Sequence, residues 1–284
     1  MNRPRRHAFV ALLLAISLGC EARLEGSSAW RTDPLWDDGN AEFCAYEVDW
    51  YRYGRLNAGR ALLIVVKEPW APDLEVKADT PRPDGFDVLK LNHVRDVSTG
   101  IYTYHQMASV FVRRQSGELQ KLAATSSEGC GISTAQMTGG TLTTSSYFDG
   151  QGDERWDYPP GALAEDGLPM TLRDFLDGET PTKVEVFPSL MAGRFPSLDV
   201  ATYRVERQKV SAVQVPAGSF DAIEIKLIDG TRWMAYTFDS RPPHALVRAT
   251  RDDGTVYRLA KCERIPYWDM NIPGGEDWLP VSVR

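Results

Sequence analysis

The side chains best suited to catalysis or metal binding are few and widely separated along this chain. His93, His105 and His244 follow the N-terminal region, and no two of them have the spacing of a metal-binding motif. Cys130 lies between two glycines, where it could be a nucleophile with His93 or His105 as its base. A turn or a bulge in a strand explains this position more simply. We therefore expect no enzymatic activity, and a hydrolase built on these residues is the least favoured function.

Acidic side chains cluster in residues 148–157 (FDGQGDERWD), a segment similar to a calcium-binding loop. The aspartates and glycine of such a loop are out of register here, which favours an acidic surface loop over a calcium site. A glycine-rich loop ending in Lys-Ser or Lys-Thr, which would bind phosphate, does not occur in the sequence. The sequence thus predicts neither a metal nor any other cofactor.

The N-terminal residues have the pattern of an export signal. Three arginines precede an apolar run at residues 8–18, which is too short to span a bilayer, and Gly19 and Cys20 follow at once. A cysteine at this position is typical of bacterial lipoproteins, so we expect cleavage after Gly19 and lipidation of Cys20. Glu21 is not the aspartate of inner-membrane retention, which favours the periplasmic side of the outer membrane. The alternative is plain secretion, with cleavage after Ala22.

The charge and polarity of the rest of the chain indicate which classes of partner it can bind. Removal of the predicted signal, residues 1–19, also removes three arginines and changes the formal net charge from −7 to −10. An acidic surface disfavours nucleic acid and anionic lipid head groups as partners, so the lipid anchor would be the contact with the membrane. We divide the mature chain into a polar tether (20–40), a β-domain (41–268) and a C-terminal tail (269–284).

If a lipid occupies Cys20, three cysteines remain: Cys44, Cys130 and Cys262. An odd number in an oxidising compartment leaves one pair and a free thiol, or no pair. Cys44 lies near the start of the first predicted strand and Cys262 near the end of the last. Because the terminal strands of a curled sheet often meet, we predict a disulfide between Cys44 and Cys262.

Alternation of apolar and polar residues predicts strands through most of the chain. Tyr46, Val48 and Trp50 would share one face of a strand, and apolar residues alternate with charged ones in residues 223–227. Residues 61–66 are apolar throughout, which predicts a strand that is covered on both faces.

Two Asp-Gly pairs predict hairpins near the C-terminus. Residues 223–228 would pair with residues 232–238 across Asp229-Gly230, and residues 245–251 with residues 255–261 across a turn ending in Asp253-Gly254. Aspartate and glycine tolerate the positive φ values of tight turns.

Helix is scarce in the pattern. The best candidate is residues 172–177, with Thr171 as N-cap and an apolar face of Leu172, Phe175 and Leu176. So short a helix would pack over an open edge or mouth of the sheet. Residues 98–112 fit either a helical turn or a strand.

Residues 215–227 (VPAGSFDAIEIKL) resemble a group of bacterial periplasmic proteins of unknown function, in which a Pro-x-Gly-x-Phe turn precedes a strand. The similarity covers residues 200–268, where an aromatic strand, a proline-containing turn and a last hairpin follow. It implies an architecture similar to the lipoprotein carriers LolA and LolB, a half-barrel with a helical lid, and supplies no catalytic residues. We therefore expect a mainly β fold, a single large antiparallel sheet curled into a half-open barrel with one or two short helices.

Met234, Tyr236 and Phe238 alternate along one strand and would share a face. A curled sheet can enclose more volume than its side chains fill, and these three residues would then line an apolar groove. Together with the resemblance, this predicts a non-enzymatic envelope lipoprotein that binds or carries an apolar, lipid-like ligand. The alternative is a structural or protein-binding envelope component whose sheet is simply filled with side chains.

Overall fold

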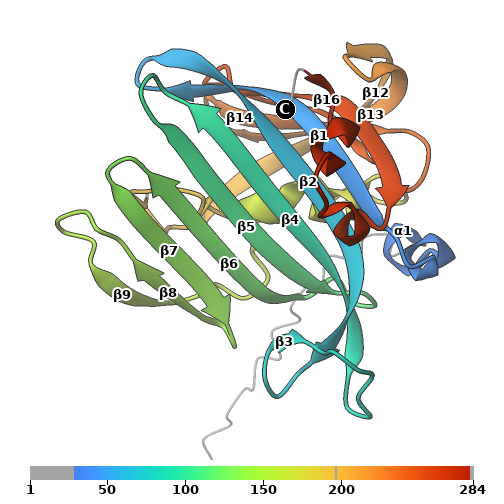
Figure 1. The fold of residues 1–284 in the computed structure, drawn as a ribbon, viewed down its shortest axis with the longest axis horizontal. Helices are drawn as coiled ribbons and strands as arrows, with labels where there is room; N and C mark the ends of the chain where they lie inside the picture. The colour runs from blue at the N-terminus through green and yellow to red at the C-terminus, as the bar shows by residue number, and fades with distance from the viewer. Residues whose placement is uncertain (1–28, 196, 282–284) are drawn as a thin grey trace, which may run out of the picture.

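The strands form one large sheet. The computed structural model describes residues 29–195 and 197–281, and sixteen strands within these residues belong to the sheet (Figure 1). They are β1 (Ala41–Arg52), β2 (Arg55–Ala71), β3 (Val76–Lys77), β4 (Phe86–Ser98), β5 (Thr103–Arg113), β6 (Leu119–Glu128), β7 (Gly131–Thr138), β8 (Thr141–Ser145), β9 (Asp153–Asp157), β10 (Leu163–Ala164), β11 (Lys183–Phe187), β12 (Ala201–Val215), β13 (Gly218–Asp229), β14 (Arg232–Asp239), β15 (Leu246–Arg251) and β16 (Val256–Ile265).

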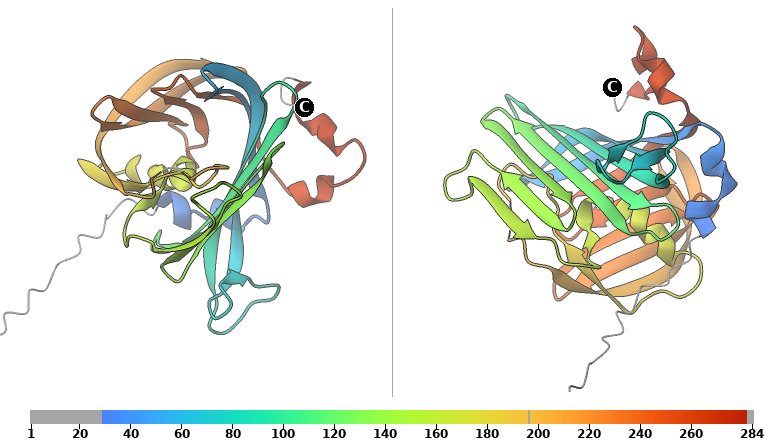
Figure 2. Two further views of the ribbon diagram at one scale, coloured as in Figure 1. Left: turned by 90° about the vertical axis from the view of Figure 1, so that its left-hand side faces the viewer. Right: turned by 90° about the horizontal axis from the view of Figure 1, so that it is seen from below.

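The sheet is curled but not closed. Its strand order is β10-β11-β12-β13-β14-β15-β16-β1-β2-β4-β5-β6-β7-β8-β9, with β3 beside β2, so β9 and β10 lie at opposite ends. Figure 2 (left) shows the strands arching around the short helical segment, which lies on the concave side, or hollow, of the sheet. Register shifts place an extra residue in β16 opposite β1 and in β15 opposite β14, and such irregularities bend the strands further. The predicted half-open barrel of one large sheet is confirmed, although β10 and β11 pair in parallel rather than antiparallel.

The two C-terminal hairpins form where the Asp-Gly pairs predict them. β13 and β14 pair up to Asp229 and Arg232, and Gly230 between them has a φ of 61°. β15 and β16 also pair as an antiparallel hairpin, and Gly254 in the turn between them has a φ of 91°. The ambiguous residues 98–112 are the end of β4, a turn and most of β5, so the strand alternative holds there.

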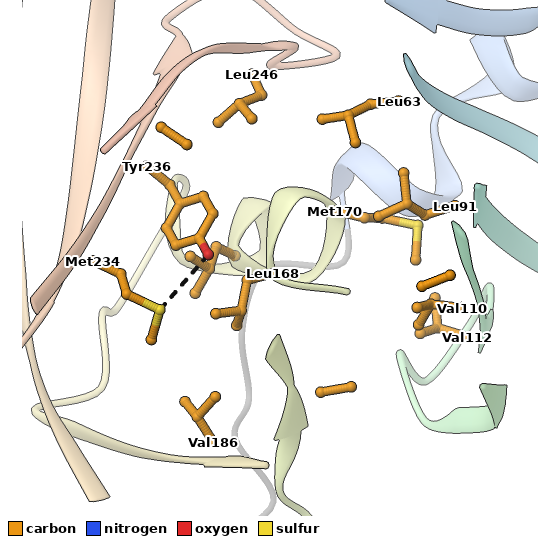
Figure 3. Packing of buried hydrophobic residues seen from close by; sticks show 14 of the residues in the cluster. Leu63, Leu91, Val110, Val112, Leu168, Met170, Val186, Met234, Tyr236 and Leu246 are labelled. Atoms are coloured by element: carbon orange, nitrogen blue, oxygen red, sulfur yellow. Dashed lines mark hydrogen bonds between the residues drawn. The ribbon is translucent and has the colours of Figure 1, made fainter. Parts of the chain in front are cut away.

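A short helical segment fills part of the hollow. It consists of the 3-10 helix η2 (Glu165–Gly167), the helix α2 (Leu168–Thr171) and the 3-10 helix η3 (Leu172–Phe175). Figure 3 shows Leu168 and Met170 between Tyr236 on one wall and Leu91 on the other. The predicted apolar face of Leu172, Phe175 and Leu176 is buried. Helix η3 begins at Leu172 as predicted, but helical turns already precede it from Glu165, and the Thr171 side chain makes no capping hydrogen bond.

The C-terminal residues cover the outer face of the sheet, so the prediction of a tail over residues 269–284 is wrong for the part described. The 3-10 helices η4 (Tyr267–Met270) and η5 (Gly275–Trp278) lie on β1 and β2. The ring of Phe43 lies 5.4 Å from that of Tyr267 and 5.0 Å from that of Trp278. With Ile64 and Val66 buried beneath this cover, β2 is covered on both faces as predicted.

The tether predicted over residues 20–40 is also wrong from residue 29 onward. Helix α1 (Ala29–Thr32) and the 3-10 helix η1 (Pro34–Asp37) pack on the domain through two tryptophans. Trp30 is 3% exposed and donates a hydrogen bond of 2.6 Å to Asp174, and Trp36 is 1% exposed. The polar composition of the segment predicted a solvated tether. The burial of two large tryptophan side chains stabilises the packed conformation instead. Residues 1–28, including Cys20, lie outside the described residues, and none of the helices described is long and apolar enough to cross a membrane.

Candidate ligand-binding cavity

A cavity of about 1020 Å³ occupies the concave side of the sheet beside the helical segment. Ligand-binding pockets usually enclose roughly 300–1,000 Å³, so the cavity is large enough for a sizeable ligand. Its walls come from β1, β2, β4, β13, β14, β15 and β16, from the start of the helical segment and from residues 186–194 and 197–203. The helical segment leaves this volume open because it spans only part of the hollow.

Two of the three residues predicted to line a groove do so. Met234 and Tyr236 face the cavity, and the Tyr236 hydroxyl contacts the Met234 sulfur at 3.8 Å (Figure 3). Phe238 does not line it, and that prediction is wrong. A strand advances about 3.3 Å per residue, so Phe238 lies about 7 Å beyond Tyr236. There it is fully buried, in the same apolar cluster as Leu172 and Phe175.

Most of the cavity residues near Met234 and Tyr236, here called the apolar wall, are apolar, although Arg251 of β15 lies opposite Met234. Leu63 from β2, Met191 from the loop before β12, and Leu246 and Ala249 from β15 also line the cavity, and each is less than 9% exposed. Apolar side chains this close together offer a ligand a surface on which hydrocarbon leaves water, worth roughly 25 cal/mol per Å² buried.

A second set of cavity residues, here called the polar wall, includes the guanidinium of Arg95. Its Nε and Nη2 donate to the Gln106 Oε1 at 3.0 and 2.5 Å, and its Nη1 donates to the Tyr257 hydroxyl at 3.1 Å. The Trp50 ring lies under the guanidinium, with 4.5 Å from Arg95 Cζ to the ring centroid. Within the part of the chain described, the Arg95 guanidinium forms no ion pair with a carboxylate.

His93 lies two residues before Arg95 on β4 and faces the same cavity. Its Nε2 lies 3.2 Å from the Tyr257 hydroxyl, and its Nδ1 is buried without a hydrogen-bond partner among the described residues. Burial, with a smaller contribution from the positive charge of Arg95, lowers the pKa of the His93 imidazole to about 3. His93 is therefore neutral near pH 7.

Two acidic residues begin the helical segment at the cavity. Glu165 forms an ion pair with Arg251 of β15. Asp166 accepts hydrogen bonds from the Ser189 hydroxyl at 2.5 Å and from the Leu190 N–H at 2.8 Å. Burial raises the pKa of the Asp166 carboxyl to about 6, even though these two hydrogen bonds act to lower it. Both carboxylates are thus occupied by partners other than Arg95.

Charged residues surround the mouth of the cavity. Arg232 and Asp229 form an ion pair at the β13–β14 turn, and the exposed Asp252 and Asp253 lie at the β15–β16 turn. Arg52, at the end of β1, lies over the rings of Trp50, Tyr53 and Tyr104. The mouth is mixed in charge, and where an apolar groove was predicted the cavity has polar as well as apolar lining residues.

The two cysteines predicted to pair are joined. Cys44 on β1 and Cys262 on β16 lie directly opposite each other and form a disulfide, with Cα atoms 4.0 Å apart. The first and last long strands of the domain are neighbours in the sheet, which is what brings these residues together. Cys20 lies outside the described residues.

The other candidate residues do not assemble into a site. Cys130 is exposed in the β6–β7 turn, and its sulfur lies 3.9 Å from the Tyr102 hydroxyl. His105 pairs with Asp96 at 2.8 Å, and the buried His244 contacts the Asp239 carbonyl oxygen at 2.9 Å. Among the residues that the structure describes, no group of His, Cys, Asp and Glu side chains is placed to hold a metal ion.

The polar wall was missed by sequence reasoning, although the signal was present. Leu89, Leu91, His93 and Arg95 alternate along β4, so period-2 spacing puts all four on the inward face. A histidine and an arginine continuing an inward apolar row indicate a polar site inside a sheet. The contribution of Asp166 had no comparable signal, because it depends on how the helical segment enters the hollow.

Comparisons with known proteins find likeness in solved structures and none in sequence. No protein-family model matches the chain, and no curated protein matches it. A solved β-barrel-like protein of domain of unknown function DUF1849 from Brucella abortus is similar, with 9% identity, 79% of this chain and 97% of that chain covered, and a TM-score of 0.49. A likeness at this level identifies no site residue and no ligand. It names neither LolA nor LolB, and the resemblance to those carriers stays a prediction.

Proposed function

We propose that this protein is a non-enzymatic lipoprotein of the cell envelope that binds or carries a lipid-like ligand in the cavity. The observation that supports this most directly is a volume of about 1020 Å³ beside an apolar wall of Leu63, Met234 and Leu246. Side chains that merely filled the sheet would leave no such volume, since protein interiors are otherwise packed as closely as organic crystals.

A substitution that fills the cavity tests this proposal. Ala249 lines the cavity and is 8% exposed, so Ala249→Trp would occupy ligand volume. Ala58, exposed on β2, provides the control variant Ala58→Trp. After gentle extraction, native mass spectrometry should detect a bound lipid on the wild type and on Ala58→Trp but not on Ala249→Trp. If the wild type carries no lipid, or if all three carry it equally, the structural or protein-binding alternative takes the place of this proposal.

The cellular address is part of the same proposal. The basic start, the apolar run at residues 8–18 and the Gly19-Cys20 pair support cleavage after Gly19, lipidation of Cys20 and attachment on the periplasmic side of the outer membrane. Two acyl chains anchor a protein stably where a single chain does not. Mass spectrometry of the native N-terminus should find a lipid-modified Cys20. A free N-terminus at Arg23 would establish secretion instead.

A further inference from the structure

The cavity contains a guanidinium, that of Arg95, which forms no ion pair with a carboxylate among the described residues. Glu165 pairs with Arg251, and Asp166, which accepts from Ser189 and Leu190, interacts with the charge of Arg95 without contacting it. Removing a cation from water is unfavourable unless an anion or enough hydrogen-bond acceptors compensate for it. Gln106 and Tyr257 provide neutral acceptors only.

The hydrogen bonds of Arg95 leave donors available. A guanidinium has five N–H bonds, and three of those of Arg95 are directed to Gln106 and Tyr257. The other two, one on Nη1 and one on Nη2, have no partner among the described residues. A pair of parallel N–H donors on one guanidinium matches the two oxygens of a carboxylate or a phosphate.

The guanidinium is held in position before any ligand arrives. Gln106 is 3% exposed and is itself fixed, because its Nε2 donates to the Ser126 hydroxyl and to the Met191 carbonyl oxygen at 3.1 and 2.7 Å. The Trp50 ring supports the other side of Arg95. A group that is already ordered loses little conformational entropy on binding.

We propose that the cavity recognises an amphiphile with an acidic head group, a carboxylate or a phosphate, whose anionic oxygens bind Arg95. The hydrocarbon part lies against Met234, Tyr236 and Leu246 on the apolar wall. This inference rests on the proposed function and specifies its ligand class. The acidic net charge of the chain does not oppose it, because Arg95 lies inside the cavity and not on the outer surface.

Matched probes that differ in head-group charge test the inference on the full-length protein, extracted and delipidated. Oleate is compared with oleyl alcohol, and 1-oleoyl-lysophosphatidate with 1-oleoylglycerol, by isothermal titration calorimetry. At least one acidic probe should bind about tenfold or more tightly than its uncharged counterpart, since a hydrogen bond to a charged group contributes roughly 1.5–3 kcal/mol. Preference for oleate or for the lysophosphatidate distinguishes a carboxylate from a phosphate head group.

Variants of Arg95 locate the effect. Arg95→Met should remove most of the preference for the acidic probe and change binding of the uncharged probe less than about threefold, while Arg95→Lys should keep part of the preference. Arg60→Met is the matched control, because Arg60 pairs with Asp96 on the outer face of the sheet. Equal wild-type affinity for acidic and uncharged probes, or equal weakening of both by Arg95→Met, would overturn the inference. If no probe binds the wild type, the proposed function itself fails.

Discussion

Asp166 and His93 face the same cavity, and burial favours the neutral form of each. For the acid this means a pKa raised to about 6, and for the base a pKa lowered to about 3. The two residues therefore affect stability in opposite directions as the pH falls. Aspartate is more easily protonated in the folded state than in the unfolded chain, whereas histidine is less easily protonated there.

Asp166→Asn should stabilise the protein more at pH 8 than at pH 5. The carboxyl has a pKa of 3.8 in the unfolded chain and about 6 when folded, so its ionisation opposes folding above pH 6 by up to about 3 kcal/mol. This free-energy penalty decreases as the pH falls towards 4, because the carboxyl is then protonated in the folded state. Asparagine has no ionisable group and so has no such penalty at any pH. Urea unfolding at both pH values measures the difference in unfolding free energy between variant and wild type. A difference that is the same at pH 5 and pH 8 would contradict the prediction.

His93→Phe should show the opposite trend. The unfolded chain takes up a proton at this histidine below about pH 6.5, while the folded state resists until about pH 3, so the wild type loses stability across this window. Phenylalanine removes that loss. The unfolding free energy of the variant relative to the wild type should thus be more favourable at pH 4.5 than at pH 8, as urea titrations at these two pH values can measure. The prediction would be disproved if the unfolding free energy of His93→Phe, relative to that of the wild type, were lower at pH 4.5 than at pH 8.

At the scale of elements, a buried ion pair fastens the helical segment to the sheet. Arg173 of η3 donates to Glu42 of β1 at 2.6 Å, and both side chains are less than 5% exposed. The same guanidinium donates to the Pro243 carbonyl oxygen at 3.0 Å and lies 5.2 Å from the centroid of the Trp30 ring. Arg173 thus connects the helical segment, β1, the β14–β15 turn and helix α1.

Arg173→Met should lower the unfolding free energy by about 3–5 kcal/mol, because it leaves the Glu42 carboxylate buried without its partner. The double variant Arg173→Met with Glu42→Gln should recover part of that loss. Arg204→Met, which breaks the exposed pair with Glu206, is the control and should cost less than about 1 kcal/mol. Urea unfolding of all four proteins provides the comparison. Equal effects of the two single variants would rule out a special role for the buried pair.

The elements that could be predicted are those set by local patterns. Period-2 alternation and the Asp-Gly turns predicted the turn ends of β13 to β16 to within about one residue, because such hairpins join sequence neighbours, whereas β13 begins earlier and β16 ends later than predicted. Trp30 packs against Asp174, which lies 144 residues away, and no local pattern indicates this contact. The segment that contains Trp30 was therefore predicted to be a tether. The charged wall of the cavity was missed for a related reason. Whether Arg95 finds a carboxylate depends on where Glu165 and Asp166 lie in space, which spacing along the chain does not determine.

At the scale of the whole molecule, the disulfide joins the first and last long strands across 218 residues of sequence. Replacing both cysteines, in Cys44→Ser with Cys262→Ser, should reduce the unfolding free energy by about 2–5 kcal/mol, because the open chain gains conformational freedom when it unfolds. Cys130→Ser, at an exposed free thiol, should change stability by less than about 0.5 kcal/mol. Guanidinium unfolding under non-reducing conditions measures both. Loss of stability in Cys130→Ser alone would contradict this assignment.

The same bond closes residues 44–262 into a covalent ring. One proteolytic cut within the ring, for example in the exposed β8–β9 loop, would leave both fragments linked and every strand tied to its neighbour. A nicked molecule should therefore run as a single full-length species on a non-reducing gel and separate into two bands only after reduction. Because the fragments stay joined, a protein of this kind can be cut once within the ring and still keep its cavity.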